Sequence, residues 1–403
     1  SVMLQGKRIL LIITGSIAAY KSLDLIRLLT KAGATVEGVL TKGGKQFVTP
    51  LSVETLTGKK AHIEMWDENS YEMNHIELSR RADLIVVAPA TADFLSKMIH
   101  GEGDDLASSI MLAKNKPVIF APSMNVEIWD NPAFQRNLTA AQADGAQLVS
   151  PQVDMLACGE VGIGKMAEPM TIFDTVEAHF ALESSLEGKT AIVTSGATIE
   201  RIDSVRFLSN FSSGKQGNAI ALALAKAGAQ ITLVSGKSSE APPLHPRIAI
   251  IQTESAADMM KAVHQALPAD AFVGCAAVCD FAIANRSDRK IKKSEGLQIE
   301  FEENPDIARS IGTLPQTERP PVVVGFAAET DQLINYARKK LFDKRCDLIV
   351  ANDVSGGAVF GKDENQANFV TRDSIEVLET MSKEALGHAI ASWIAQSLQT
   401  VDA

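Results

Sequence analysis

The sequence lacks several features that would place it in a specialised class of protein. Its four cysteines, at positions 158, 275, 279 and 346, include no Cys-x-x-Cys pair. This pattern predicts no disulfide framework and is typical of reduced thiols in a cytoplasmic protein. No apolar run approaches the roughly 18–20 residues that a membrane helix needs. Residues 7–13 predict a first strand in place of a signal peptide, so we expect a cytoplasmic protein without membrane contact.

The chain also lacks an excess of positive charge. Its formal net charge is −10, which argues against broad nucleic-acid binding because that needs a basic face to displace counterions. Local binding of a nucleotide is still compatible with this charge. With 403 residues, 46% of them hydrophobic and 22% charged, the chain has the composition of an ordinary globular protein of two or three domains.

Similar segments recur in the same order in the two halves of the chain. The pairs are 9–16 and 191–196, 31–36 and 226–231, 86–94 and 273–281, and 118–122 and 323–328. This repetition predicts an α/β fold with two Rossmann-like domains in series. Small and polar residues near 184–188 mark the boundary, which gives domains 1–188 and 189–403. The second half carries an extra segment, 200–215, which we predict to be a special loop.

Short apolar runs predict the strands of both halves. They lie near 8–13, 35–40, 84–87, 117–120 and 147–149, and again near 190–194, 230–234, 272–275, 322–326 and 347–350. Because these runs are continuous, they are typical of parallel strands covered by helices on both faces. Leucines at helical spacing predict a helix over 17–32 that Gly33 ends, and the charged run 286–293 predicts a loop.

The segment 14–21, Thr-Gly-Ser-Ile-Ala-Ala-Tyr-Lys, follows the first predicted strand and opens a helix. Gly15 permits a tight turn, Ser16 offers a hydroxyl, and free N–H groups at a helix start can bind a phosphate. The segment lacks the Gly-x-Gly-x-x-Gly fingerprint, which favours a mononucleotide over NAD. An ordinary turn between strand and helix is the alternative.

Three polar residues of the first half could carry chemistry. His75 is a candidate catalyst, although a lone histidine is more often a surface or core residue. Asn125 follows a predicted strand, where open α/β sheets bind ligands, and it could equally cap a helix. Cys158 lies among Gly159, Gly162 and Gly164, which favours a reactive thiol on a flap over a buried one.

In the second half, Ser-Ser-Gly-Lys at 212–215 could hold a phosphate at a helix start, but the Walker A spacing is absent. Lysines gather at 290, 292 and 293 and again at 339, 340 and 344. Cations at strand ends suit a triphosphate, whereas 339–344 could also be a solvated helix face. Asp280 could bind a base, a ribose or a metal, or could cap a helix.

Several motifs together resemble one known family. In the first half they are Gly-Ser-Ile-Ala-Ala-Tyr-Lys at 15–21, His-Ile-Glu-Leu at 75–78, Ala-Pro-Ala-Thr-Ala-Asp at 88–93, Ala-Pro-Ser-Met-Asn at 121–125 and the glycine-spaced segment 157–169. Their order resembles that of flavin-containing cysteine decarboxylases. The second half contributes motifs at 198–203, 210–215, 276–280, 290–293, 304–307, 324–330 and 351–353. Almost end to end, the chain resembles the bacterial bifunctional phosphopantothenoylcysteine decarboxylase/phosphopantothenate–cysteine ligases of coenzyme A biosynthesis.

This resemblance implies an FMN-dependent decarboxylase in the first half. FMN oxidises the cysteinyl thiol of 4′-phosphopantothenoylcysteine toward a thioaldehyde, so that the electrons left by carbon dioxide have an acceptor. His75 acts as the base near the flavin, Asn125 holds the substrate carboxylate, and Cys158 donates the final proton. The implied flavin contacts are Gly15, Ser16, Ala88, Thr91 and Met124.

The resemblance implies a CTP-dependent ligase in the second half. It activates 4′-phosphopantothenate as an acyl-cytidylate, which the amine of cysteine then attacks. Lys290 assists formation of the acyl-cytidylate, and Asn210 acts on it with cysteine. Magnesium is expected because pyrophosphate leaves. The implied CTP contacts are Gly274, Cys275, Ala276, Asp280, Lys290, Pro305, Asp306, Ile307, Ala308, Phe326, Lys340 and Lys344.

The family resemblance also implies a homo-oligomer, with trimeric contacts in the first half, dimeric contacts in the second and a dodecamer overall. Five residues depart from the family pattern and leave their contacts open: Asp104, Lys165, Ser195, Ala197 and Cys279. Two other classes stay open at this point. A nicotinamide-dependent oxidoreductase would need the missing glycine fingerprint, and a non-catalytic flavin-binding regulatory protein should lack His75 or Cys158.

Overall fold

The computed structural model of the chain describes all residues except 1–3, 64–73, 156–160, 330–331 and 354–363. The chain divides into two compact units, Ser1–Ala181 and Leu182–Ala403. The structural boundary lies before the turn at 183–188, which leads into the first strand of the second unit. The boundary predicted from the sequence lies at the end of this turn, after residue 188.

The first unit contains a five-stranded parallel sheet in the order β2-β1-β3-β4-β5. Its strands are β1 (Arg8–Ile13), β2 (Thr35–Leu40), β3 (Leu84–Ala90), β4 (Val118–Pro122) and β5 (Gln147–Leu148), with a separate antiparallel pair β6 (Gln152–Met155) and β7 (Val161–Lys165). Its helices are α1 (Ala19–Lys31), α2 (Pro50–Thr57), α3 (Asn74–Arg81), α4 (Ala92–His100), α5 (Leu106–Ala113), α6 (Val126–Trp129), α7 (Pro132–Ala143) and α8 (Pro169–Leu182). The strand order reverses between β1 and β3, and ligands bind at such switch points.

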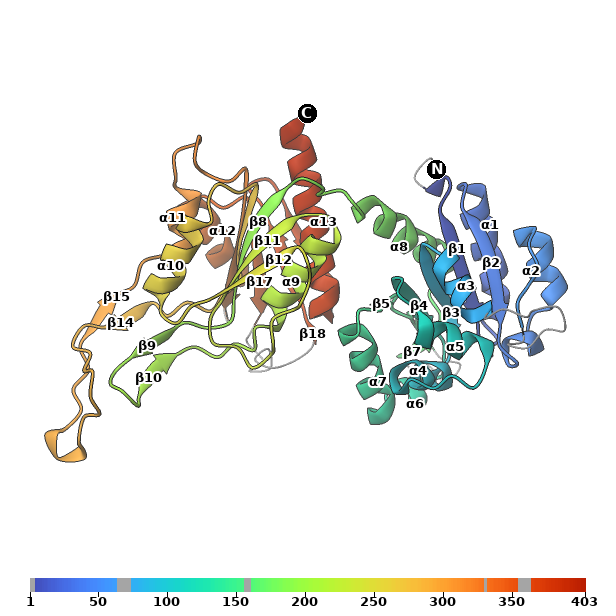
Figure 1. Ribbon diagram of the computed structural model, residues 1–403, viewed down its shortest axis with the longest axis horizontal. Helices are drawn as coiled ribbons and strands as arrows, with labels where there is room; N and C mark the ends of the chain where they lie inside the picture. Colours follow the sequence, from blue (N-terminus) through green and yellow to red (C-terminus); the bar gives the residue numbers. More distant parts are fainter. Residues whose placement is uncertain (1–3, 64–73, 156–160, 330–331, 354–363) are drawn as a thin grey trace. The chain divides into compact units, whose positions relative to one another are not determined.

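Helices cover both faces of this sheet (Figure 1). Ile9, Leu11 and Ile13 of β1 belong to a core with α1 and α8. Leu10 and Ile12 belong to a second core with α4, α5 and α7. Alternate side chains of one strand therefore enter two different cores, and this explains why the strand reads as one continuous apolar run.

The second unit has an eight-stranded sheet in the order β12-β11-β8-β13-β16-β17-β19-β20. The strands from β12 to β17 are parallel, and β19 and β20 extend the sheet in antiparallel pairing. They are β8 (Thr190–Ser195), β11 (Gln230–Ser235), β12 (Ile248–Gln252), β13 (Ala271–Gly274), β16 (Val322–Glu329), β17 (Leu348–Asp353), β19 (Ala367–Val370) and β20 (Ile375–Val377), and β18 (Glu364–Asn365) pairs with β21 (Met381–Ser382).

Helices again cover both faces. Val193 of β8 packs with α9 (Lys215–Lys226) and α13 (Lys383–Asp402). Ile192 packs on the opposite face with α10 (Ala256–Gln265), α11 (Ile307–Gly312) and α12 (Leu333–Asp343). The predicted fold class, two Rossmann-like α/β domains in series, is confirmed.

Two antiparallel ribbons extend from this sheet (Figure 1). One is the hairpin β9 (Ile199–Arg201) and β10 (Phe207–Ser209), and the other pairs β14 (Phe281–Ile283) with β15 (Phe301–Glu303). We call the second ribbon and its connection, residues 281–303, the arm. The segment 200–215 is thus partly a hairpin, whereas 286–293 is the predicted loop, at the outer part of the arm.

All ten predicted strands are present, and α1 lies within the predicted helix 17–32. Gly33, with φ of +98°, follows the helix as expected of a C-terminal glycine. Gly162 and Gly164, predicted in a flap, lie in the strand β7. Within the described part of the chain, no helix is long and apolar enough to cross a membrane.

Candidate active sites

A cavity of about 780 Å³ opens at the carboxyl ends of the first sheet. It lies at the turns after β1, β2 and β3, which is the switch point of the strand order. Its lining residues are Thr14, Gly15, Leu40, Thr41, Lys42, Gly43, Lys45, Ile63, Thr91, Asp93, Phe94, Lys97, Asp104, Asp105, Leu106 and Ala107. Two predicted flavin contacts, Gly15 and Thr91, are among them.

Thr14 joins the ends of β1 and β3 at the floor of this cavity. Its buried hydroxyl donates to the carbonyl of Pro89 (2.6 Å) and accepts from the amide of Thr91 (3.1 Å). Gly15 lies against Gly43, so a Cβ at Gly15 would be 2.8 Å from the Cα of Gly43. The two turns can therefore approach each other only because both residues are glycine.

The predicted first-half motifs are joined by hydrogen bonds although they are far apart in sequence. The hydroxyls of Ser16 and Ser123 are 2.7 Å apart. The half-exposed carboxylate of Glu168 accepts from the buried Lys21 ammonium at 2.8 Å, and this bond lowers the pKa of Glu168. The amide of Met124 donates to the carbonyl of Gly164 at 2.9 Å. This hydrogen bond holds β7 against the turn after β4.

The other described residues predicted for the first half are not among the residues that line this cavity. His75 is half-buried on α3, and Met124 is half-buried. Ala88 is buried in β3, where its carbonyl accepts from Ser22 (2.7 Å). Asn125 is exposed and caps α6, accepting from the amide of Ile128 (2.9 Å). Cys158 lies outside the described residues.

Sequence reasoning missed the basic side of this cavity. Lys42 and Lys45 follow β2, and Lys97 lies on α4 across from them. Lys97 is 3.3 Å from Asp104, and this contact lowers the pKa of the Asp104 carboxyl. The signal was available in Thr-Lys-Gly-Gly-Lys at 41–45, a glycine turn directly after a predicted strand. Asp104, a departure from the family pattern, thus faces the cavity as the partner of Lys97.

A second cavity, of about 540 Å³, opens at the carboxyl ends of β13 and β16 in the second unit. Every predicted CTP contact except Cys275 and Lys290 lines it. Its lining residues are Thr194, Phe272, Gly274, Ala276, Val278, Cys279, Asp280, Phe281, Glu303, Asn304, Pro305, Asp306, Ile307, Ala308, Arg309, Gly325, Phe326, Lys340, Lys344 and Ile349.

Charged side chains of both signs line one wall of the second cavity. Lys340 lies on α12, and Lys344 follows at the end of the same helix. The Lys344 ammonium is 3.3 Å from a carboxylate oxygen of Asp306, which also caps α11 by accepting from Arg309 N–H (3.0 Å). Two cations one helical turn apart can approach an anion from one side.

Asn304 connects the second cavity to the hairpin. Its side-chain amide donates to the buried Glu200 (3.0 Å) and to the carbonyl of Cys279 (2.9 Å), and its backbone amide donates to the carbonyl of Asp280 (2.8 Å). Thr198 supports the same wall, since its hydroxyl accepts from the amide of Cys279 (2.9 Å). Cys279, another departure, is buried there.

The other predicted ligase residues lie at the border of this cavity or away from it. Burial raises the pKa of Cys275 to about 12, so this thiol is protonated at neutral pH. Asn210 is exposed at the end of the hairpin and donates to the carbonyl of Val278 (3.3 Å), whose side chain lines the cavity. Lys290 is exposed on the outer part of the arm and does not line the cavity.

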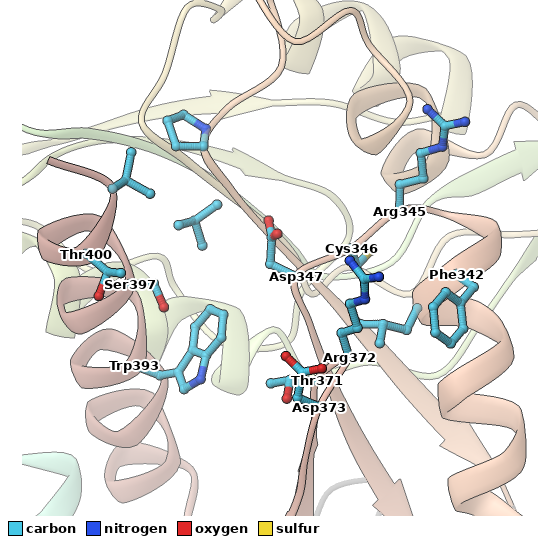
Figure 2. Close-up of a pocket in the computed structure, with 14 residues that line it drawn as sticks. Phe342, Arg345, Cys346, Asp347, Thr371, Arg372, Asp373, Trp393, Ser397 and Thr400 are labelled. Carbon is cyan, nitrogen blue, oxygen red and sulfur yellow. The ribbon is translucent and has the colours of Figure 1, made fainter. Parts of the chain in front are cut away.

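A third cavity, of about 670 Å³, opens at the opposite end of the strands of the second sheet. Figure 2 shows Trp393 and Thr400 of α13 on one side and Phe342 and Arg345 on the other. Asp347 in its interior is paired with Arg319 (3.0 Å). No predicted site residue lines this cavity, so it is separate from the expected chemistry.

Two doubly wound units, each with a cavity at the carboxyl ends of its strands, define a two-domain α/β protein with a candidate ligand site in each unit. Residues 1–181 match the family described as Flavoprotein, and residues 186–398 match the DNA/pantothenate metabolism flavoprotein C-terminal domain. A coenzyme A biosynthesis bifunctional protein CoaBC from Haemophilus influenzae is 42% identical over 98% of this chain and 99% of its own. The protein of the same name from Bacillus subtilis is 40% identical over 98% of each chain.

The chain belongs to this family of bifunctional coenzyme A biosynthesis proteins. Among solved structures, the C-terminal domain of a CoaBC protein is 34% identical, with a TM-score of 0.45, and covers 54% of this chain and 100% of its own. The family predicted from the sequence is confirmed, and with it a bifunctional ligase and decarboxylase of coenzyme A biosynthesis. The oxidoreductase and the non-catalytic regulatory protein are not favoured.

Proposed function

We propose that the second unit joins cysteine to 4′-phosphopantothenate with CTP and that the first unit decarboxylates the product with FMN. The observation that carries this proposal is the second cavity, where residues from separate motifs between positions 274 and 344 line one pocket. The two reactions are consecutive, because the carboxylate that leaves as carbon dioxide is the one that cysteine brings.

In the ligase, the carboxylate of phosphopantothenate attacks the α-phosphorus of CTP and pyrophosphate leaves. The amine of cysteine then attacks the acyl carbon, and CMP leaves. Lys340 and Lys344 offset the phosphate charge, and Asp280 accepts hydrogen bonds from the nucleoside. Lys290 assists the first step, and Asn210 acts in the second.

Magnesium accompanies the triphosphate in this proposal. No group of three His, Cys, Asp or Glu in the described part of the chain is arranged to hold a metal ion. This fits an ion held mainly by nucleotide phosphates and water, as is usual for magnesium in nucleotide sites.

The pocket assignment predicts that Lys344→Met weakens CTP binding. Loss of one charge-assisted contact, worth about 1.5–3 kcal/mol, should raise the KM for CTP roughly 10–100-fold with a smaller change in kcat. Steady-state kinetics of pyrophosphate release measures this. Lys339→Met is the matched control, because Lys339 is exposed on the same helix and does not line the cavity. Equal KM values for both variants would contradict the assignment.

The first cavity fits FMN. Its volume lies within the range of cofactor sites, Lys42 and Lys45 can hold a phosphate, and the contact between Gly15 and Gly43 forms a backbone wall beside them. A bound flavin supplies hydride transfer. Asn125 orients the substrate carboxylate, His75 accepts a proton near the flavin, and Cys158 returns a proton at the end.

Gly15→Ala should therefore weaken flavin binding. Its Cβ would clash with Gly43 backbone and separate the two turns that form the wall. We expect wild-type protein to be yellow and to release FMN, not FAD, on denaturation, and the variant to be largely colourless while it keeps ligase activity. Absorbance and chromatography of the released cofactor test this. A variant that retains full flavin would show that the contact does not shape the site.

We also propose a homo-oligomer in which the first domain forms trimers, the second forms dimers and both together form a dodecamer. Exposed apolar side chains support both contacts. Ile17 and Leu51, on the first unit, are 76% and 71% exposed. Phe211 beyond the hairpin is 82% exposed, and Phe301 on the arm is 57% exposed. Such side chains favour burial against another protein surface.

Light scattering should give a mass near twelve times the 43.1 kDa of one chain. A monomer at working concentration would refute this assembly. A trimer alone would refute the dimeric contact of the second domain, and a dimer alone would refute the trimeric contact of the first domain.

A further inference from the structure

A buried carboxylate joins the hairpin to the arm. The side chain of Asp203, in the turn between β9 and β10, is fully buried. One oxygen accepts from the backbone amides of Val205 (2.9 Å) and Arg206 (2.7 Å). The other accepts from the Arg206 guanidinium and from the amide of Ile291 (3.1 Å) on the arm.

These bonds hold the segment that carries Lys290. Ile291 directly follows Lys290, and the Arg206 guanidinium also donates to the carbonyl of Ile291 (3.3 Å). On the other side of Lys290, the amide of Ser287 donates to the carbonyl of Ile202 (3.0 Å). The arm is thus attached to the hairpin three residues before and one residue after Lys290.

The same hairpin leads to Asn210, which is bound to the wall of the second cavity through Val278. Lys290 and Asn210 are therefore held by one structural unit, although they are far apart in sequence. A lysine on a freely moving loop would lose conformational freedom each time it met its substrate, whereas an attached loop has already lost most of it.

We propose that Asp203 is a positioning residue of the ligase, which fixes the Lys290 segment of the arm against the hairpin for the first step. The inference rests on the proposed role of Lys290. Burial alone would raise the pKa of Asp203, but the hydrogen bonds from Val205, Ile291 and Arg206 outweigh it and lower the pKa to about 2. The carboxylate is therefore ionised, and an acceptor only, at neutral pH.

Asp203→Asn tests the proposal with nearly unchanged side-chain size. An amide in place of one carboxylate oxygen cannot accept from Ile291 N–H and Arg206 together with the existing bonds. With CTP, magnesium and phosphopantothenate, we expect at least a tenfold slower appearance of the acyl-cytidylate, with the KM for CTP changed less than twofold. Amide hydrogen exchange over 287–292 should become faster, while decarboxylation of added phosphopantothenoylcysteine stays at the wild-type rate.

Asp288→Asn is the matched control, since Asp288 is exposed on the same loop. Ile291→Pro removes the backbone N–H that donates to Asp203. This variant tests the proposal if Asp203→Asn does not fold. Wild-type rates of intermediate formation in the folded Asp203→Asn protein or in Ile291→Pro would overturn the proposal, as would slow formation with unchanged exchange over 287–292. Lys290→Gln, measured in the same assay, distinguishes the proposed role of Lys290 from the proposed role of Asp203. If it forms the intermediate normally, the role of Lys290 fails, whereas the exchange data still report on the attachment.

Discussion

Replacement of Gly164 by alanine should stop decarboxylation and leave the ligase active. A Cβ at Gly164 would lie 2.2 Å from the carbonyl oxygen of Met124, so β7 must move away from the turn that leads to Asn125. In the sequence, Cys158 lies between β6 and β7. We expect the rate of carbon dioxide release to fall at least a hundredfold, because the turn that leads to Asn125 loses its contact with β7 and Asn125 is proposed to hold the substrate carboxylate.

The measurement is carbon dioxide release from phosphopantothenoylcysteine, with pyrophosphate release from the same preparation as the internal reference. Gly58→Ala is the matched control. Gly58 has φ of +68° and nothing within 4 Å of its added Cβ, so this change strains the backbone without a clash. Wild-type decarboxylation by Gly164→Ala would show that the contact between β7 and Met124 is not needed.

Two substitutions in the second unit should stop the ligase at different steps. Lys290→Gln removes a cation that is proposed to assist attack on CTP, and no acyl-cytidylate should form. Asn210→Asp removes a donor next to the cavity wall and adds a negative charge, which we expect to lie near the cytidylate phosphate. The intermediate should therefore form, persist and react at least tenfold more slowly with cysteine.

Mass spectrometry of the quenched reaction distinguishes these outcomes. The assignment of Lys290 to the first step and Asn210 to the second is wrong if Lys290→Gln accumulates 4′-phosphopantothenoyl-cytidylate. It is equally wrong if Asn210→Asp shows none. Lys293→Gln is the matched control for charge, because Lys293 is exposed on the same arm and has no proposed role in the ligase reaction.

The parallel strands could be predicted because each is a short apolar run, buried on both faces, between helices. The strand β12 was missed because it is an edge strand whose side chains are mostly exposed, as in Ile251. The strands β19 and β20 were also missed. They are short, and they extend the sheet by antiparallel pairing of β19 with β17 and of β20 with β19. Pairing within the folded sheet, more than local propensity, forms such strands.

Ten of the twelve residues that the family resemblance implies as CTP contacts line the second cavity, together with residues that were not predicted. The first cavity was predicted only in part. Lys42 and Lys45 enter it from the turn after β2 and Lys97 enters it from α4, and nothing local in the sequence shows that these two segments meet. The bond of Asp203 was also invisible, because the amide that it holds belongs to Ile291, on a different ribbon.

The timed release of pyrophosphate and carbon dioxide from one wild-type reaction tests the central claim most directly. The protein is incubated with 4′-phosphopantothenate, cysteine, CTP and magnesium. Pyrophosphate should appear first, and carbon dioxide should follow after a lag in an equal final amount. Omission of cysteine should stop carbon dioxide release, and omission of CTP should stop both products. Carbon dioxide released without CTP, or pyrophosphate that never leads to carbon dioxide, would contradict two consecutive activities in this chain.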